Sequence, residues 1–104
     1  MELSDKIKED IKQNKIMLYM KGTKEMPMCG FSNTVVQLLN HYEADFSATN
    51  VLEDPAIRVK LTEYSNWPTI PQLFVNGELI GGCDIVVELH QKGELTNILN
   101  QSKD

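Results

Sequence analysis

The stretch Met28-Cys29-Gly30-Phe31-Ser32 lies between a predicted β-strand and a predicted α-helix. The strand is the compact apolar run 16–21, and the helix follows from apolar residues that recur at helical spacing over 35–42. Gly22 and Pro27 interrupt regular structure between them. We therefore expect Cys29 at or just before a helix N-terminus, where free backbone N–H groups and the helix dipole stabilise a thiolate. The thiolate is the form of cysteine that attacks disulfides and binds metals.

Length and composition predict a single globular domain over residues 1–104. Of the 104 residues, 41% are hydrophobic and 24% are charged, which is enough for one core without disulfide staples. The net charge of −5 provides no basic face for phosphate and argues against nucleic-acid binding. No apolar run reaches the length of a membrane span, and the acidic N-terminus lacks the features of a signal peptide. Two cysteines are too few for a disulfide scaffold, so we expect a reducing compartment, the cytoplasm.

The first half of the chain predicts a βαβ unit. An amphipathic helix over 3–14, capped by Ser4 or Asp5, is expected first and is interpreted as packing at the sheet edge. Strand 16–21, the helix that follows Cys29 and a strand over 46–51 come next. Strand, helix and strand at this spacing form a right-handed crossover with parallel strands.

The second half predicts a helix followed by a ββα unit. Asp54-Pro55 is typical of a helix start, with a cap and then proline in the first turn. Asn76-Gly77 predicts a tight hairpin turn between strands 72–75 and 78–80. Asp84 is the expected N-cap of the next helix, and a short helix over 94–99 ends the order. The whole order predicts an α/β fold of thioredoxin-like architecture, a mixed four-stranded sheet with helices on both faces.

Four blocks of the sequence carry a family resemblance. They are 20–22 with Pro27, 29–32, 67–73 and 76–84. In the second block, Ser32 stands where the Cys-x-x-Cys motif of thioredoxin-like proteins has its second cysteine. Together the blocks resemble a monothiol glutaredoxin of the Cys-Gly-Phe-Ser type, over residues 16 to about 99, so residues 1–104 would be a single glutaredoxin domain.

The resemblance implies glutathione binding beside Cys29 and a homodimer bridged by one [2Fe-2S] cluster. The cluster ligands would be Cys29 of each subunit and the thiolates of two bound glutathiones. The family's role is to carry the cluster to apo acceptor proteins, often with a BolA-like partner. A protein of this kind would be a monomer when it is free of the cluster.

The resemblance also assigns a glutathione site. Lys21 and Arg58 would bind the glycyl carboxylate, although the residues alone indicate solvated surface cations. The family pattern predicts a cis peptide bond between Ile70 and Pro71. Such a bond exposes the backbone N–H and C=O of Ile70, which can pair with the glutathione peptide as a short added strand. Thr69 lies beside this position.

Gly82, Cys83 and Asp84 open a predicted helix whose amides suit a carboxylate. The Asp84 side chain suits an ammonium group, and the γ-glutamyl end of glutathione has both groups. Cys83 would then act mainly through its backbone, while a disulfide with Cys29 is the open alternative. Phe31 and Trp67 are interpreted as core or rim packing, with partner contact equally open for Trp67.

The residues alone favour a monothiol cycle. Ser32 cannot close a disulfide, so glutathione would have to resolve any mixed disulfide at Cys29. A [2Fe-2S] cluster needs four thiolates, and one chain has only Cys29 and Cys83, so cluster binding favours a dimer with an added thiol. His41 and His90 are interpreted as ordinary surface residues.

The same Cys29 also permits a different function. A glutathione-dependent thiol-disulfide oxidoreductase would act on protein–glutathione mixed disulfides by a monothiol mechanism. A plain interaction module would leave the turn at Cys29, Ile70-Pro71 and Gly81-Gly82 unexplained.

Overall fold

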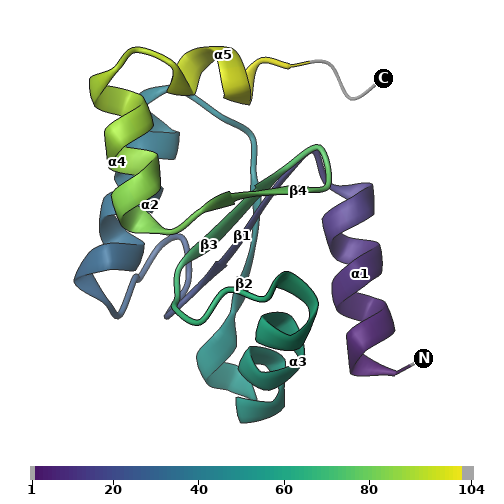
Figure 1. The fold of residues 1–104 in the computed structure, drawn as a ribbon. Helices are drawn as coiled ribbons and strands as arrows, with labels where there is room; N and C mark the ends of the chain where they lie inside the picture. Colours follow the sequence, from purple (N-terminus) through teal and green to yellow (C-terminus); the bar gives the residue numbers. More distant parts are fainter. Residues whose placement is uncertain (1, 102–104) are drawn as a thin grey trace.

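The computed structural model describes residues 2–101, built around a mixed four-stranded sheet (Figure 1). The strands are β1 (Ile16–Met20), β2 (Ser47–Asn50), β3 (Gln72–Val75) and β4 (Glu78–Gly81), in the order β2-β1-β3-β4. β1 pairs parallel with β2 and antiparallel with β3, and β3 pairs antiparallel with β4. This confirms the predicted thioredoxin-like sheet; the expected domain of 1–104 also includes residue 1 and residues 102–104, which lie outside the described residues.

Helices cover both faces of the sheet (Figure 1). One face carries α2 (Gly30–His41), α4 (Cys83–Gln91) and α5 (Leu95–Leu99), and the other carries α1 (Leu3–Gln13), α3 (Pro55–Ser65) and the short 3₁₀ helix η1 (Val51–Glu53). Within residues 2–101, no helix is long and apolar enough to cross a lipid bilayer.

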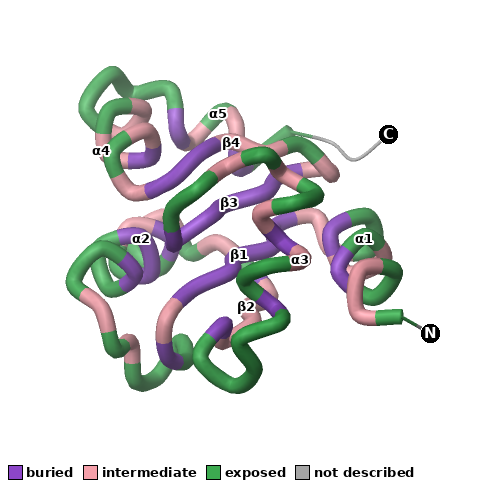
Figure 2. Tube along the Cα trace, turned by 60° about the horizontal axis from the view of Figure 1, so that its bottom comes forward, coloured by how far each residue is buried: buried purple, intermediate pink, exposed green. Residues whose placement is uncertain are grey.

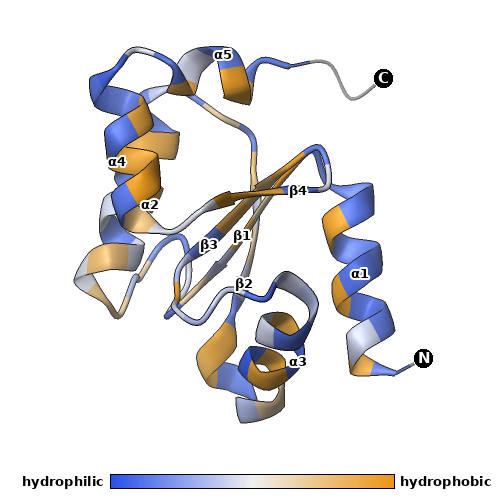
Figure 3. Cartoon of the chain, in the orientation of Figure 1, coloured by the Kyte–Doolittle hydropathy of each residue, from blue (hydrophilic) through white to orange (hydrophobic). Residues whose placement is uncertain are grey.

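The core forms two layers because successive side chains of a strand point to opposite faces. In β1, Ile16, Leu18 and Met20 pack with α2 and α4, while Met17 and Tyr19 pack with α1 and α3. All five residues of β1 are buried, as expected for a strand covered on both faces. The buried trace runs through β1 and β3 in Figure 2, and the apolar sides of the helices face these strands in Figure 3.

Two local sequence signals fix the second half as predicted. The Asp54 side chain accepts a hydrogen bond from the N–H of Ala56 at 2.9 Å, with Pro55 in the first turn of α3. Asn76 (φ 53°) and Gly77 (φ 84°) both have positive φ, the conformation that a two-residue hairpin turn requires.

The predicted helix caps were wrong at two positions. The N-cap of α1 is Glu2, which makes no side-chain cap hydrogen bond, and Asp5 instead lies in the first turn, where its charge suits the helix dipole. The N-cap of α4 is Gly82, because the chain turns at Gly81 (φ 147°) and the helix already begins at Cys83. Asp84 therefore lies within the first turn of α4.

The position of α1 and the end of β2 also differ from the sequence prediction. α1 packs against α3 on a face of the sheet instead of at its edge, with Ile7 and Ile11 buried in that layer. β2 ends at Asn50, because the Asn50 side chain accepts from the N–H of Leu52 at 2.9 Å and starts η1.

Candidate functional site

Cys29 occupies the N-cap position of α2, as the sequence predicts. Its backbone is extended (φ −151°, ψ 134°), and its carbonyl accepts the first helical hydrogen bond from the N–H of Asn33 at 2.8 Å. The thiol is therefore placed over the free N–H groups of the first turn, at the positive end of the helix dipole.

The surroundings of the Cys29 thiol lower its pKa. The largest cause is the backbone N–H of Ser32, and the N–H of Phe31, the Ser32 hydroxyl and the charge of Lys21 act in the same direction. Partial burial opposes them. A thiol with a lowered pKa carries more thiolate near neutral pH, which favours both nucleophilic attack and metal ligation.

Ser32 is fully buried, at 0% exposure, one turn along α2 from Cys29. Its hydroxyl accepts a hydrogen bond from the backbone N–H of Lys21 at 3.1 Å. The position that would hold a second cysteine therefore holds a hydroxyl that joins β1 to α2 and cannot form a disulfide.

The loop from Gly22 to Met28 folds back on itself. Gly22 pairs with Pro27 in an isolated antiparallel bridge, and the backbones of Thr23 and Met26 exchange two hydrogen bonds of 3.1 Å. Gly22 has a φ of 93°, and a Cβ there would lie 2.5 Å from the carbonyl oxygen of Met26. Only glycine fits this turn without displacing the backbone that leads to Cys29.

Two side chains from elsewhere hold this loop in place. Asn50 Oδ1 accepts from the N–H of Gly22 at 2.9 Å, in addition to its bond with Leu52. Lys24 Nζ donates to the carbonyl of Phe46 and lies 4.2 Å from the centre of the Phe46 ring. Sequence reasoning missed Asn50 and Lys24, because no local pattern distinguishes either residue from an ordinary polar surface residue.

Three large apolar side chains close to Cys29 in the sequence are exposed at the surface. Met26, Met28 and Phe31 are 71%, 68% and 63% exposed, and we call these three residues the apolar rim. Packing of Phe31 in the core was one of the expectations, and it is wrong. The rim is unusual for a surface because three large apolar side chains are exposed within six positions that include Cys29.

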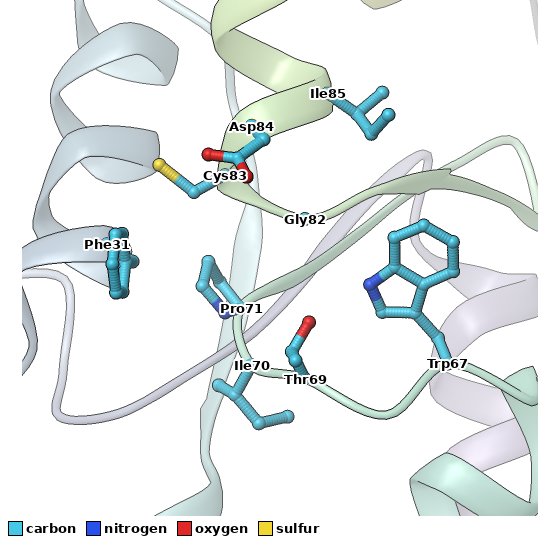
Figure 4. Close-up of a pocket in the computed structure, with 9 residues that line it drawn as sticks. All are labelled: Phe31, Trp67, Thr69, Ile70, Pro71, Gly82, Cys83, Asp84 and Ile85. Carbon is cyan, nitrogen blue, oxygen red and sulfur yellow. The ribbon is translucent and has the colours of Figure 1, made fainter.

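A cavity of about 180 Å³ lies next to the helix starts of α2 and α4. Figure 4 shows its lining, with Phe31 and Cys83 on one side of Pro71 and Trp67 on the other. The full lining consists of Phe31, Trp67, Thr69, Ile70, Pro71, Gly82, Cys83, Asp84 and Ile85. The structure thus brings together the predicted residues of the 67–73 and 76–84 blocks. It has the predicted cis bond at Ile70–Pro71 and adds Ile85, which sequence reasoning did not single out.

Gly82 lies close to the opposite wall of this cavity. A Cβ at Gly82 would lie 3.2 Å from the carbonyl oxygen of Pro71 and 3.4 Å from Trp67 Nε1. The Trp67 Nε1 atom is buried and has no hydrogen-bond partner among residues 2–101, and Figure 4 shows it on the side of the indole that faces Gly82. The cavity therefore contains a donor that a bound molecule can satisfy.

The two predicted cations, like Cys29 itself, are not among the residues that line this cavity. Arg58 is exposed on α3 and lines a second cavity of about 550 Å³, together with Val59, Thr62, Asn66, Trp67 and Pro68. Trp67 belongs to both linings and therefore borders both cavities. Lys21 acts on Cys29 through its charge and contacts Ser32 through its backbone.

Cys83 differs from Cys29 in its electrostatics. Burial is the largest cause that raises the pKa of Cys83, and the charges of Asp84 and Cys29 add to it, while the Thr34 hydroxyl opposes them. Both cysteines are free thiols in the structure. Cys29 is therefore the more reactive thiol, and Cys83 stays protonated to higher pH.

Comparison with known proteins agrees with this geometry. The sequence model of the family described as Glutaredoxin matches residues 16–80. A protein of Rickettsia typhi named "Probable monothiol glutaredoxin 2" is 59% identical over 93 residues, which cover 89% of this chain and 84% of that protein. The solution structure of reduced poplar apo GrxS14 is 48% identical, with a TM-score of 0.81 over 91% of this chain and 87% of that one.

A crystal structure of a buckwheat glutaredoxin–glutathione complex has the same fold, with a TM-score of 0.82 and 26% identity over 93% of this chain and 86% of that one. The match to the family model, the identity with named relatives and the Cys29–Ser32 motif agree with one another. The chain therefore belongs to the glutaredoxin family, as a monothiol glutaredoxin of the Cys-Gly-Phe-Ser type.

Proposed function

We propose that the protein binds glutathione beside Cys29, holds a [2Fe-2S] cluster between two subunits and delivers this cargo to apo acceptor proteins. The observation that carries the proposal is the combination of a cysteine at position 29 with a serine at position 32. Cys29 is an accessible thiol with a lowered pKa, and Ser32 places a buried hydroxyl where a resolving thiol would stand. Cys29 can therefore bind a metal or a thiol partner without being lost to a disulfide with position 32.

The cavity suits glutathione in shape and chemistry. Gly82 leaves a space that a Cβ would fill, and the unpaired N–H of Trp67 borders it. The first amides of α4, beside Cys83, suit the γ-glutamyl carboxylate, and Asp84 suits the ammonium group. Thr69, Ile70 and Pro71 form the wall along which the peptide would lie, and the buckwheat relative was crystallised with glutathione. Lys21 and Arg58 are the cations available for the glycyl carboxylate.

The number of thiolate ligands that a cluster needs favours a cluster shared between two chains. A [2Fe-2S] cluster needs four thiolates. Among residues 2–101, no group of three or more His, Cys, Asp or Glu side chains is placed to hold a metal ion. Cys29 from each of two subunits, with one glutathione thiolate each, would supply the four sulfur ligands. The assembly would be a homodimer with its cluster and a monomer without it.

The apolar rim gives this proposal a surface for partners. Met26, Met28 and Phe31 would pack against a second subunit, an apo acceptor protein or a BolA-like partner, because all three lie exposed beside the cluster ligand Cys29. We place this exchange in the cytoplasm, where a reducing environment keeps Cys29 and Cys83 as free thiols.

A second function uses the same thiol for exchange. The Cys29 thiolate would attack the glutathione sulfur of a protein–glutathione mixed disulfide, and the protein thiolate would leave and take up a proton. A second glutathione thiolate would then attack the sulfur of the bound glutathione. This step releases oxidised glutathione and restores the Cys29 thiolate. The lowered pKa of Cys29 favours this alternative.

Anaerobic reconstitution with iron, sulfide and reduced glutathione separates these functions. We expect a coloured dimer with one [2Fe-2S] cluster, measured by visible absorption together with mass in solution, that becomes a monomer when the cluster is removed. Cys29→Ser should abolish the cluster, while the matched variant Cys83→Ser should retain it. A colourless monomer, combined with rapid deglutathionylation by the cluster-free protein, would favour the exchange function instead.

A further inference from the structure

Two histidines and a tyrosine lie close together at the C-terminal end of α2, the opposite end of that helix from Cys29. The sequence indicates ordinary surface histidines, but the structure brings them together. Tyr42 Oη and His90 Nδ1 lie 2.6 Å apart, within hydrogen-bond distance. The ring centres of His41 and Tyr42 are 5.0 Å apart, and those of His41 and His90 are 5.8 Å apart. Because α2 contains 12 residues, this group lies about 18 Å along the helix from Cys29.

We propose that His41 and His90 bind one divalent transition-metal ion, with Tyr42 orienting the His90 ring. The site is separate from the thiol site and does not depend on glutathione or on a cluster. Imidazole is the ligand that Zn²⁺, Cu²⁺ and Ni²⁺ share, and Cu²⁺ binds such nitrogen sites most tightly. Water would complete the coordination, because no third His, Cys, Asp or Glu side chain joins such a group among residues 2–101.

The spacing of the two imidazole rings fits a shared ion. With metal–nitrogen bonds of about 2.0–2.1 Å, two imidazoles on one tetrahedral ion have ring centres roughly 5–6 Å apart. The observed separation is 5.8 Å, with an angle of 85° between the ring planes. Of the two rings, His41 would have to turn toward the free nitrogen of His90, since Tyr42 lies within hydrogen-bond distance of the other His90 nitrogen.

The bond to Tyr42 prepares His90 as a ligand. In the tautomer with its proton on Nδ1, His90 donates to Tyr42 Oη and leaves the lone pair of Nε2 free for a metal. Histidine ligands usually donate their other ring N–H to a second group in this way, which fixes the tautomer and the direction of the ring. Tyr42 is half-buried, so its own position is restricted.

The backbone also favours a cation at this point. His41 lies in the last turn of α2, and His90 lies in the last turn of α4. The C-terminal end of a helix carries partial negative charge from unpaired carbonyl groups. Two such ends meet here, because the rings of His41 and His90 are in contact. A bound cation would complement both helix ends and would link α2 to α4.

The test uses the full chain with Cys29→Ser and Cys83→Ser, so that no thiol binds or reduces the metal. We expect one Cu²⁺ per chain, with an electron paramagnetic resonance spectrum that shows two imidazole nitrogens. His41→Gln and His90→Gln should each weaken binding about tenfold or more, and Tyr42→Phe should weaken it by about 10-fold to 100-fold while both nitrogens remain. Asn40→Ala, an exposed neighbour on α2, is the matched control and should leave the affinity unchanged.

Thermal unfolding provides a second readout that does not depend on copper. Zn²⁺ should raise the Tm of the thiol-free protein but not that of the variant that also carries His41→Gln and His90→Gln, because only a native-state site stabilises the fold. Melting without metal checks that each variant is folded. Cu²⁺ binding that survives loss of both histidines, or a spectrum with only one imidazole nitrogen, would overturn the proposed site. An unchanged affinity in Tyr42→Phe would overturn the role of Tyr42.

Discussion

The backbone N–H of Lys21, just after β1, donates to the buried hydroxyl of Ser32 in α2 at 3.1 Å. The bond holds the first turn of α2 against the end of the central strand. The same hydroxyl and the N–H of Ser32 both help to lower the pKa of Cys29. A residue that cannot resolve a disulfide thus has two other roles, one structural and one electrostatic.

Replacing Ser32 with alanine should therefore change both stability and reactivity. The N–H of Lys21 would lose its acceptor, which should cost about 1–3 kcal/mol of the free energy of unfolding. The pKa of Cys29 should rise only in part, because the backbone N–H of Ser32, the largest cause of its lowering, remains. The pH dependence of Cys29 alkylation, measured with Cys83→Ser present, reports the change.

Ser47→Ala is the matched control for this experiment, since the Ser47 hydroxyl donates to Asn14 Oδ1 at 2.9 Å, away from the thiol. It should leave the alkylation profile of Cys29 unchanged. If Ser32→Ala gave the same profile as the control, the Ser32 hydroxyl would have no electrostatic effect on Cys29.

The two cysteines should change stability with pH in opposite directions. The pKa of Cys29 is lowered on folding, so the folded state releases its proton first and stability rises with pH from the folded pKa to the unfolded pKa. The pKa of Cys83 is raised on folding, so stability falls as pH rises from the unfolded pKa to the folded pKa.

The measurement is urea unfolding in the presence of a reductant, at about pH 7 and about pH 10. These two pH values lie on either side of the unperturbed cysteine pKa. Relative to the parent protein, Cys29→Ser should lose stability between the two pH values, and Cys83→Ser should gain it. Each variant serves as the control for the other. Changes of the same sign in both variants would contradict the opposite shifts of the two pKa values.

The turn at Gly22 should be sensitive to a single added methyl group. In Gly22→Ala, the new Cβ would lie 2.5 Å from the oxygen of Met26 and 2.6 Å from the nitrogen of Met28, at a φ of 93°. We expect a loss of about 1–3 kcal/mol from strain at positive φ, or more if the loop must open. Urea unfolding measures this loss.

Gly30→Ala is the matched variant, because a Cβ at Gly30 meets no atom within 4 Å and its φ is not positive. It should unfold at a urea concentration close to that of the parent protein. Equal stability of the two alanine variants would show that the loop from Gly22 to Met28 is not fixed in the described conformation.

Gly82→Ala should separate ligand binding from folding. The added methyl group would meet Pro71 O at 3.2 Å and Trp67 Nε1 at 3.4 Å, so these neighbours would have to shift by a few tenths of an ångström. The same methyl group would fill the part of the cavity proposed for glutathione. We expect the glutathione affinity, measured by calorimetry, to fall severalfold while circular dichroism stays unchanged.

Ser47→Ala again provides a control for the Gly82 experiment, because Ser47 lies on β2 and does not line the cavity. Its glutathione affinity should equal that of the parent protein. An unchanged affinity in Gly82→Ala would place glutathione elsewhere on the molecule.

Local patterns predicted most of the fold. Hydrophobic periodicity and turn-forming residues were enough to predict β1, α2 and the Asn76-Gly77 hairpin, because each of these elements depends on neighbouring residues. The sequence blocks also identified most of the cavity lining, from Thr69 to Asp84. These elements depend on short-range geometry, which a sequence displays directly.

The remaining features depend on distant contacts. Asn50 reaches the N–H of Gly22 across 28 positions, and Tyr42 reaches His90 across 48. Such pairs form only after the sheet and helices have packed, so no periodicity in the sequence predicts them. The start of α4 at Cys83 was missed for a different, local reason: the turn at Gly81 (φ 147°) lets the helix begin before Asp84, and the Asp84 cap signal does not contain that turn.

The position of β1 has a consequence for how the chain folds. β1 takes one neighbour, β2, from the first half of the chain and the other, β3, from the second half, with Ile16 opposite Val75. Neither half can complete the sheet alone, because the βαβ unit would expose the other edge of its most buried strand. The chain should therefore unfold as a single cooperative unit, and the long-range closure of β1 onto β3 should set the folding rate.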